Sequence, residues 1–139
     1  MSSKLCYIAT PYRSSDELGI EQNLLNGRKA AVQLMIATDY YPVSPVLNTG
    51  GFHHYEGMVQ RYDAFWIAGA LELLNRCDAI YLAPGWENSS GCIDEIIFVI
   101  RSMIMDQARP ITILINSNEG TNPIVEISIA DVMDILKKI

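Results

Sequence analysis

The chain has 139 residues, of which 50% are hydrophobic and 19% charged, so one domain with a buried core is expected over residues 1–139. This composition excludes a disordered segment. The formal net charge of -6 argues against a nucleic-acid binder, although one arginine and a helix N-terminus suffice for a single phosphate.

Short apolar runs alternate with stretches of helical spacing. Runs closed by Pro or Gly, typical of buried strands, occupy residues 5–10, 40–44 with Val46, 78–83 and 111–115. Apolar residues three and four apart predict helices over 18–38, 54–61, 63–76, 91–105 and from a Ser128 cap to Lys138. Loops are expected at 48–51 and 85–90.

This alternation predicts an α/β fold. Right-handed crossovers place helices on both faces of a parallel sheet, giving a three-layer flavodoxin-like or Rossmann-like domain with four to five strands. Ligands of such sheets bind beyond the carboxyl ends of the strands, which are here residues 10–15, 44–51, 83–91 and 116–122. A dinucleotide site is not expected, because no Gly-x-Gly-x-x-Gly follows the first strand and no Walker-A lysine motif is present.

No membrane or export segment is expected. No apolar run approaches the ~20 residues of a bilayer span, and the first five residues lack a signal-peptide apolar region. The chain has three cysteines, Cys6, Cys77 and Cys92, which lie far apart in the sequence. An odd number of widely spaced cysteines fits reduced thiols. We therefore expect a cytoplasmic protein without a membrane partner.

The densest polar stretch is Pro-Gly-Trp-Glu-Asn-Ser-Ser-Gly-Cys-Ile-Asp-Glu at 84–95. Ser89 and Ser90 can cap the following helix, whose free N–H groups then favour an anion. Gly91 allows a ligand close to the backbone, and Glu95 can project toward the same opening. A capped helix whose first acidic residues complement its dipole accounts for the pattern equally well.

A second stretch, residues 7–15, ends the first predicted strand. Tyr7 and its neighbour Ile8 point to opposite faces of the predicted sheet. A tyrosine near the carboxyl edge can hydrogen-bond a catalytic carboxylate or a substrate. Arg13 and the two serines after it can hold a phosphate. A core tyrosine and a solvated loop are the alternative, and the better interpretation of Tyr12 and Arg13 taken alone.

These stretches belong to a wider set of motifs. The chain contains, in order, Tyr-Ile-Ala-Thr-Pro-Tyr at 7–12, Pro45, Phe65-Trp66, Cys77-Asp78-Ala79-Ile80 and Gly-Trp-x-x-Ser-x-Gly-x-x-x-Glu at 85–95. Over residues 5–115 this set resembles the nucleoside 2-deoxyribosyltransferase superfamily, and most nearly a branch of small bacterial and phage proteins of unassigned function. The last string is fairly specific, whereas the first motif alone is weak.

The resemblance implies cleavage of an N-glycosidic bond in a nucleoside or nucleoside 5′-monophosphate, by hydrolysis or deoxyribosyl transfer, with no cofactor or metal. A glutamate matching Glu95 attacks the anomeric carbon and forms a glycosyl-enzyme intermediate, and the residue matching Tyr7 orients it. Ser89 matches a residue that contacts the sugar or its phosphate. The other candidate substrate-binding residues are Thr10, Tyr12, Arg13, Trp86, Ser90 and Gly91. A homodimer or higher homo-oligomer is also implied.

One position departs from the family pattern. An aspartate that helps to protonate the leaving base is expected eight residues before Asp78, where this chain has Ala70. Asp63 and Glu72 are possible substitutes, but neither matches by register. Because general-acid help is worth roughly 10²–10⁴ in rate, a nucleotide-binding or sensing module without turnover is the alternative function. A purely structural oligomer is the third candidate function.

Two further groups point less clearly to chemistry. His53 and His54 can ligate a metal, but adjacent histidines point differently and no Cys or carboxylate completes a recognisable set, so no metal site is expected. Cys92 lies near a helix N-terminus, which lowers a thiol pKa, yet no histidine is nearby in the sequence. A buried, small hydrophobic role is the better interpretation of Cys92.

Overall fold

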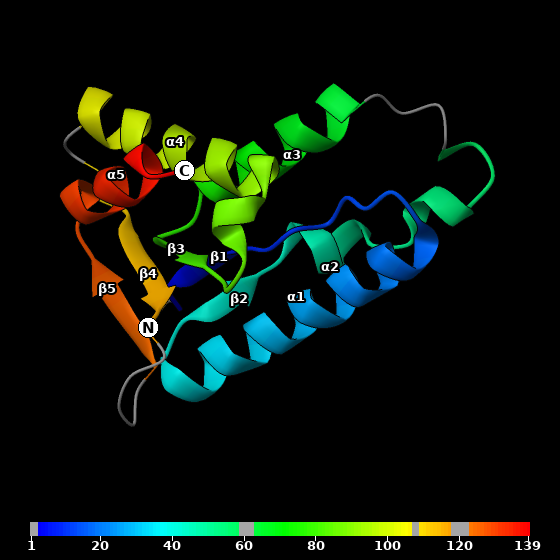
Figure 1. Cartoon of the computed structure of the whole chain (residues 1–139), viewed down its shortest axis with the longest axis horizontal. Coiled ribbons are helices and arrows are strands. Elements are labelled where there is room, and N and C mark those ends of the chain that lie inside the picture. The colour runs from blue at the N-terminus through cyan, green and yellow to red at the C-terminus, as the bar shows by residue number, and fades with distance from the viewer. Residues whose placement is uncertain (1–2, 59–62, 107–108, 118–122) are drawn as a thin grey trace.

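A five-stranded, mostly parallel sheet lies at the centre of the molecule (Figure 1). The computed structural model describes residues 3–58, 63–106, 109–117 and 123–139. The strand order is β2-β1-β3-β4-β5. The strands are β1 (Leu5–Ala9), β2 (Tyr41–Val43), β3 (Ala79–Leu82), β4 (Thr112–Asn116) and β5 (Ile124–Ile127). β1 to β4 pair in parallel and β5 pairs antiparallel with β4.

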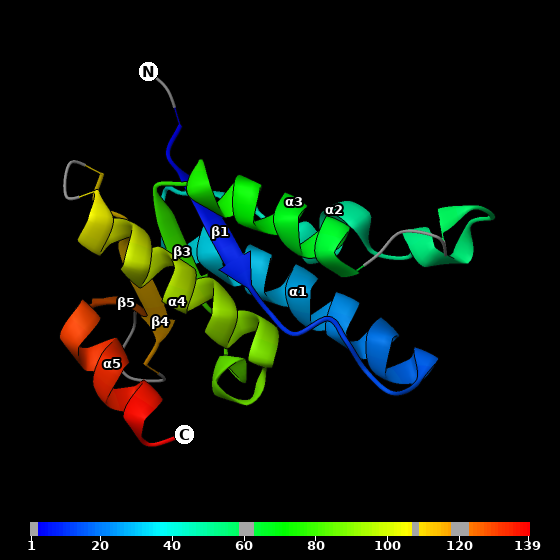
Figure 2. The same ribbon diagram turned by 90° about the horizontal axis from the view of Figure 1, so that it is seen from above.

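Helices cover both faces of this sheet. One face carries α1 (Glu17–Ala37) and the short α2 (Pro45–Thr49), and the other carries α3 (Asp63–Asn75), α4 (Ser90–Met105) and α5 (Ile129–Lys137). Figure 2 shows these last three helices laid across the same face. The predicted three-layer, flavodoxin-like α/β class is thus confirmed. None of the helices in the described part of the chain is both long and apolar enough to cross a bilayer.

The alternation of side chains along β1 and β3 builds two separate cores. Successive residues of a strand point to opposite faces, so each strand supplies both layers. Tyr7 packs with residues of α3, α4 and α5, among them Leu74, Ile96 and Val132. Cys6 and Ile8 pack instead against the α1 side, with Ala30 and Leu34. Tyr7 therefore faces the layer that contains α4, and this sets the geometry of the candidate site.

Four boundaries differ from the sequence-based prediction. Val46 lies in α2 rather than in a strand, because Ser44 Oγ accepts the N–H of Leu47 and Pro45 suits the first helical turn. Residues 85–90 contain a 3-10 turn, η3 (Trp86–Asn88). A second one, η1 (Phe52–His54), ends where a helix over 54–61 was predicted to begin. Residues 59–62 and 118–122 lie outside the described residues.

The fourth difference is the edge strand β5, which was not predicted and makes the sheet mixed rather than wholly parallel. Its two central residues, Val125 and Glu126, are exposed, so it lacks the continuous apolar run that marks the buried strands. A short edge strand with a charged residue is a common way to end a sheet.

Candidate active site

The strand order places a topological switch point between β1 and β3. The chain leaves β1 toward β2 on one side and leaves β3 toward β4 on the other, so the connections diverge at the carboxyl ends of these two strands. The segment after β3 runs directly into α4, the helix that carries Glu95. The open edge of the sheet and the start of α4 therefore meet where ligands of this fold class bind.

A short capped turn connects β3 to α4. Gly85 has a φ of 93°, a left-handed conformation that favours glycine, and it begins η3. Trp86 follows and is only 3% exposed, so its ring anchors the turn in the core. Ser89 is the N-cap of α4, and its Oγ accepts the N–H of Cys92 at 3.3 Å. Ser90 and Gly91 form the exposed first turn.

The structure describes no cationic partner for the buried Glu95 carboxyl among the residues that it covers. Its Oε2 atom is shielded from solvent and has no hydrogen-bond partner in the part of the chain that the structure describes. Burial raises the pKa of Glu95 from 4.5 to about 7; the contact with the Tyr7 hydroxyl lowers this pKa, and the nearby charge of Asp94 raises it. Near neutral pH the carboxyl is therefore present in both protonation states. Its ionised form can act as a nucleophile, and the two forms together suit a general acid–base group.

Tyr7 is the matching group on the strand side. It is 1% exposed, and burial and the Glu95 carboxyl raise the pKa of its phenol well above its usual range. The hydroxyl therefore keeps its proton and is able to donate it in a hydrogen bond to the Glu95 carboxylate. Tyr7 and Glu95, 88 residues apart, meet because strand alternation turns Tyr7 toward α4.

The contact predicts the effect of removing one hydroxyl. In Tyr7→Phe the Glu95 carboxylate loses its hydrogen-bond donor, so the pKa of Glu95 is expected to rise above its present value of about 7. A ¹³C NMR titration of the glutamate side chains measures this directly. Tyr81→Phe is the matched control, since Tyr81 is a buried strand tyrosine on the opposite face of the sheet. An unchanged Glu95 titration in Tyr7→Phe would contradict the contact.

The other candidates on the first loop lie toward α1. Thr10 is 7% exposed, and its Oγ1 has no hydrogen-bond partner in the described ranges of the chain; it faces Gly27, where a Cβ would stand 3.4 Å from that oxygen. The carbonyls of Tyr12 and Arg13 accept hydrogen bonds from Asn23 Nδ2 at 3.0 and 3.3 Å. This loop is therefore held along α1, whereas Tyr7 points into the α4 layer. Asn23 was not a candidate from the sequence, since its partners lie ten or more residues away.

The two possible substitute acids have different positions. Glu72 pairs with Arg76 at 2.7 Å on the exposed surface of α3. It lies in the last turns of that helix, just before β3 begins, and hence toward the amino edge of the sheet. Asp63 begins α3 at the other end of that helix, but its side chain lies outside the described residues. Ala70 stands between them in the same helix.

Cys92 is confirmed as a buried, small hydrophobic residue. It is 1% exposed and packs in the core beneath the start of α4. Burial raises the pKa of its thiol to about 12, even though the contact with Ser89 lowers it. Cys92 is therefore not a thiolate at neutral pH and does not compete with Glu95 as a nucleophile.

Two hollows lie near the carboxyl edge of the sheet. One of about 230 Å³ is lined by Leu82 at the end of β3, by Pro84 and Trp86 after it, and by Asn116 at the end of β4. A more open one of about 410 Å³ lies after β2, beside α1 and α2. Neither of these two is lined by Glu95 or Tyr7. The first hollow shares Gly85, Trp86 and Glu87 with the turn before α4, but Glu95 itself lines neither hollow.

Comparisons with known proteins give one structural similarity. Searches with the sequence find no matching family model and no matching curated protein. Among solved structures, a 2-deoxyribosyltransferase from Bacillus psychrosaccharolyticus is similar at 17% identity and a TM-score of 0.47, over 84% of this chain and 76% of that chain.

Proposed function

We propose that the chain is a member of the nucleoside 2-deoxyribosyltransferase-like superfamily that cleaves the N-glycosidic bond of a nucleoside or nucleoside 5′-monophosphate. Glu95 is the nucleophile in this proposal and Tyr7 is the residue that orients it. The observation that carries the proposal is the buried Glu95 carboxyl at the switch point of the sheet, with the Tyr7 hydroxyl against it and no cation beside it among the described residues. A carboxylate free of a cationic partner is available as the nucleophile of an enzyme that forms a covalent glycosyl intermediate.

The reaction follows from these two side chains. The ionised Glu95 carboxylate attacks the anomeric carbon, the C–N bond breaks, and its electron pair leaves with the base, which takes up a proton. Water or a second base then attacks the same carbon and releases the carboxylate, giving hydrolysis or base exchange. The Tyr7 hydroxyl donates to the carboxylate throughout and keeps it aligned.

The start of α4 is the proposed site for the sugar or its phosphate. The Ser89 oxygen accepts the N–H of Cys92, which leaves the hydroxyl proton of Ser89 available to donate to a ligand oxygen. The first backbone N–H groups of α4 favour a negative charge at the same place. Ser90 and Gly91 are exposed there, so a ligand can approach the backbone.

A binding or sensing module is the second candidate function. Ala70 occupies the position expected for the acid that protonates the leaving base, and the carboxylate of Glu72 is engaged by Arg76. If no other group supplies the proton, the pocket binds a nucleotide and turns it over slowly or not at all. Both functions predict binding, and only the first predicts release of free base.

Release of free base from a panel of ribo- and deoxyribonucleosides and their 5′-monophosphates tests the proposal. Chromatography of reactions with and without a second free base separates hydrolysis from exchange. We expect free base from at least one member of the panel. If no member releases base but one raises the thermal midpoint of the protein, the binding module is the correct function.

A homo-oligomer belongs to the same proposal, as do a single domain over residues 1–139 and a cytoplasmic location. Ile104 and Met105, at the end of α4, are 63% and 87% exposed. A second copy packed on this helix would bury Ile104 and Met105. It would also help to enclose Glu95, which lines neither hollow. Light scattering at micromolar concentration is expected to give at least a dimer mass, and a monodisperse monomer would count against this part of the proposal.

A further inference from the structure

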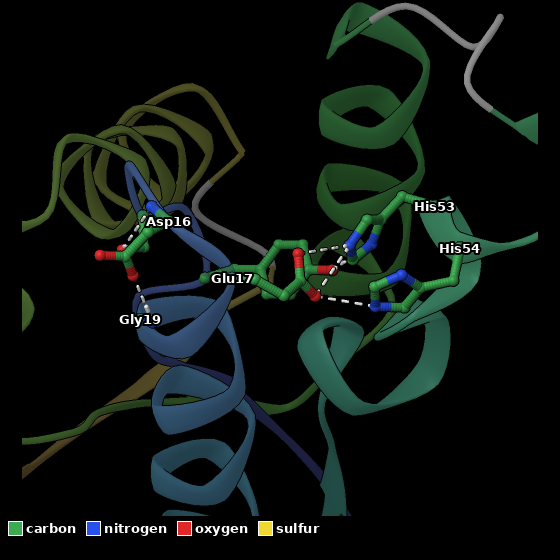
Figure 3. A network of polar contacts seen from close by, with 7 residues as sticks. Asp16, Glu17, Gly19, His53 and His54 are labelled. Atoms are coloured by element: carbon green, nitrogen blue, oxygen red, sulfur yellow. Dashed lines mark hydrogen bonds and ion pairs between the residues drawn. The ribbon is translucent and has the colours of Figure 1, made fainter.

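Three side chains that can bind a metal meet at the start of α1 (Figure 3). Glu17 is the first residue of α1, and His53 and His54 come from η1. His54 Nε2 lies 2.8 Å from Glu17 Oε1, and His53 Nε2 lies 3.4 Å from each oxygen of the same carboxylate. One ligand atom from each residue lies within 4.8 Å of the other two.

The two distances to the Glu17 carboxylate fit a small metal ion between the three groups. Zn–N and Zn–O bonds of about 2.0–2.2 Å place neighbouring ligand atoms of a tetrahedral site roughly 3.3–3.5 Å apart. The distance from His53 to the carboxylate already has this value, and the distance from His54 has to lengthen by only a few tenths of an ångström. The side chains are 38–57% exposed, so an ion reaches them from solvent.

Tyr12 supplies an outer contact that a bound metal would need. Its hydroxyl lies 3.2 Å from Nδ1 of His53, the ring nitrogen that faces away from Glu17. When Nε2 of a histidine binds a metal, Nδ1 carries the proton and usually donates it to an oxygen, which fixes the ring. Asn23 holds the backbone of Tyr12 from α1, so this oxygen is in place before an ion arrives.

We propose that Glu17, His53 and His54 form a binding site for a divalent transition-metal ion of the Zn²⁺ class, with Tyr12 as the outer hydrogen-bond partner of His53. Two imidazoles and one carboxylate are a donor set that such ions prefer, and three protein ligands leave a coordination position for water or a ligand oxygen. The ion joins η1 to the start of α1 and orders the loop that follows β1. The sequence did not predict this site because Glu17 lies 36 residues from His53.

Titration of the metal-free chain with Zn²⁺ by calorimetry, and with Co²⁺ by visible absorption, tests the site near pH 7.5. The chain has only two histidines, both in this cluster, and Cys6, Cys77 and Cys92 are buried, so few other soft ligands compete. We expect one ion per chain. His54→Gln and Glu17→Gln should each weaken Zn²⁺ binding at least about tenfold. Tyr12→Phe should also weaken Zn²⁺ binding, because His53 then loses its outer hydrogen-bond partner.

Glu21→Gln is the matched control, since Glu21 is an exposed glutamate one turn further along α1 and its loss changes the net charge equally. Its affinity for Zn²⁺ should equal that of the wild type. Equal weakening by Glu17→Gln and Glu21→Gln would show general attraction to an acidic surface and overturn the site. Absence of Zn²⁺ and Co²⁺ binding by the wild type would overturn it as well. Far-UV circular dichroism of each variant confirms that the fold is retained.

Discussion

Glu95→Gln is expected to lower the rate of base release by at least about 10³-fold, because an amide is not nucleophilic enough to attack the anomeric carbon. Glutamine has nearly the same shape as protonated glutamate, so the turn before α4 and its Ser89 cap should be preserved. Residual rate in the variant then comes from direct attack by water on a bound substrate. The measurement is kcat/KM for the best substrate of the nucleoside panel, in wild type and variant.

Asp94→Asn is the matched control for this loss. Asp94 precedes Glu95 on α4, is exposed, and its charge raises the pKa of Glu95. Its removal should preserve turnover and shift the rise of kcat/KM with pH to lower values. In the wild type that rise should have a midpoint near 7, the pKa of the nucleophile in the free enzyme. Equal losses in both variants, or full activity in Glu95→Gln, would exclude the assigned nucleophile.

Much of the architecture could be predicted from local patterns. Four apolar runs between helical stretches were enough for the sheet class and its four parallel strands, because a strand buried on both faces must be apolar throughout. The same criterion missed β5, an edge strand whose central residues Val125 and Glu126 are exposed. The apolar run 40–44 predicted Val46 as part of the same strand, but the Ser44 cap and Pro45 dominate locally and form α2.

The candidate site divides in the same way. Ser89 was predicted as a cap from its position before an apolar helix, and the cap is present. Spacing alone left Tyr7 and Ile8 equivalent; which of them faces α4 depends on which helices cover each face of the sheet. The contacts of His53 with Glu17 and Tyr12 join residues 36 and 41 apart, and no local pattern encodes them. Local physics thus predicts caps and strands, whereas convergence of distant side chains requires the fold.

The same Glu95→Gln variant should also increase stability at alkaline pH. The pKa of Glu95 is about 7 in the folded chain and 4.5 without burial, so folding favours the protonated form. The stabilisation linked to this group is complete below about pH 4.5 and is lost as the pH rises through about 7. At about pH 8.5 the variant should exceed the wild type by about 3 kcal/mol in free energy of unfolding, and at about pH 4 the two should be nearly equal.

Urea unfolding across this pH range, with the exposed Glu126→Gln as the control, distinguishes the two interpretations of Glu95 that the sequence left open. An acidic residue that only complements the dipole of α4 would make the variant less stable at alkaline pH, by about 0.3–1 kcal/mol. If Glu95 is instead a carboxylate buried against Tyr7 with no cation beside it among the described residues, the variant is more stable than the wild type at alkaline pH. A substitution that stabilises the fold and abolishes turnover is expected of a residue retained for chemistry at a cost in stability. A less stable Glu95→Gln would instead show that Glu95 has a structural role and remove the main support for the proposed function.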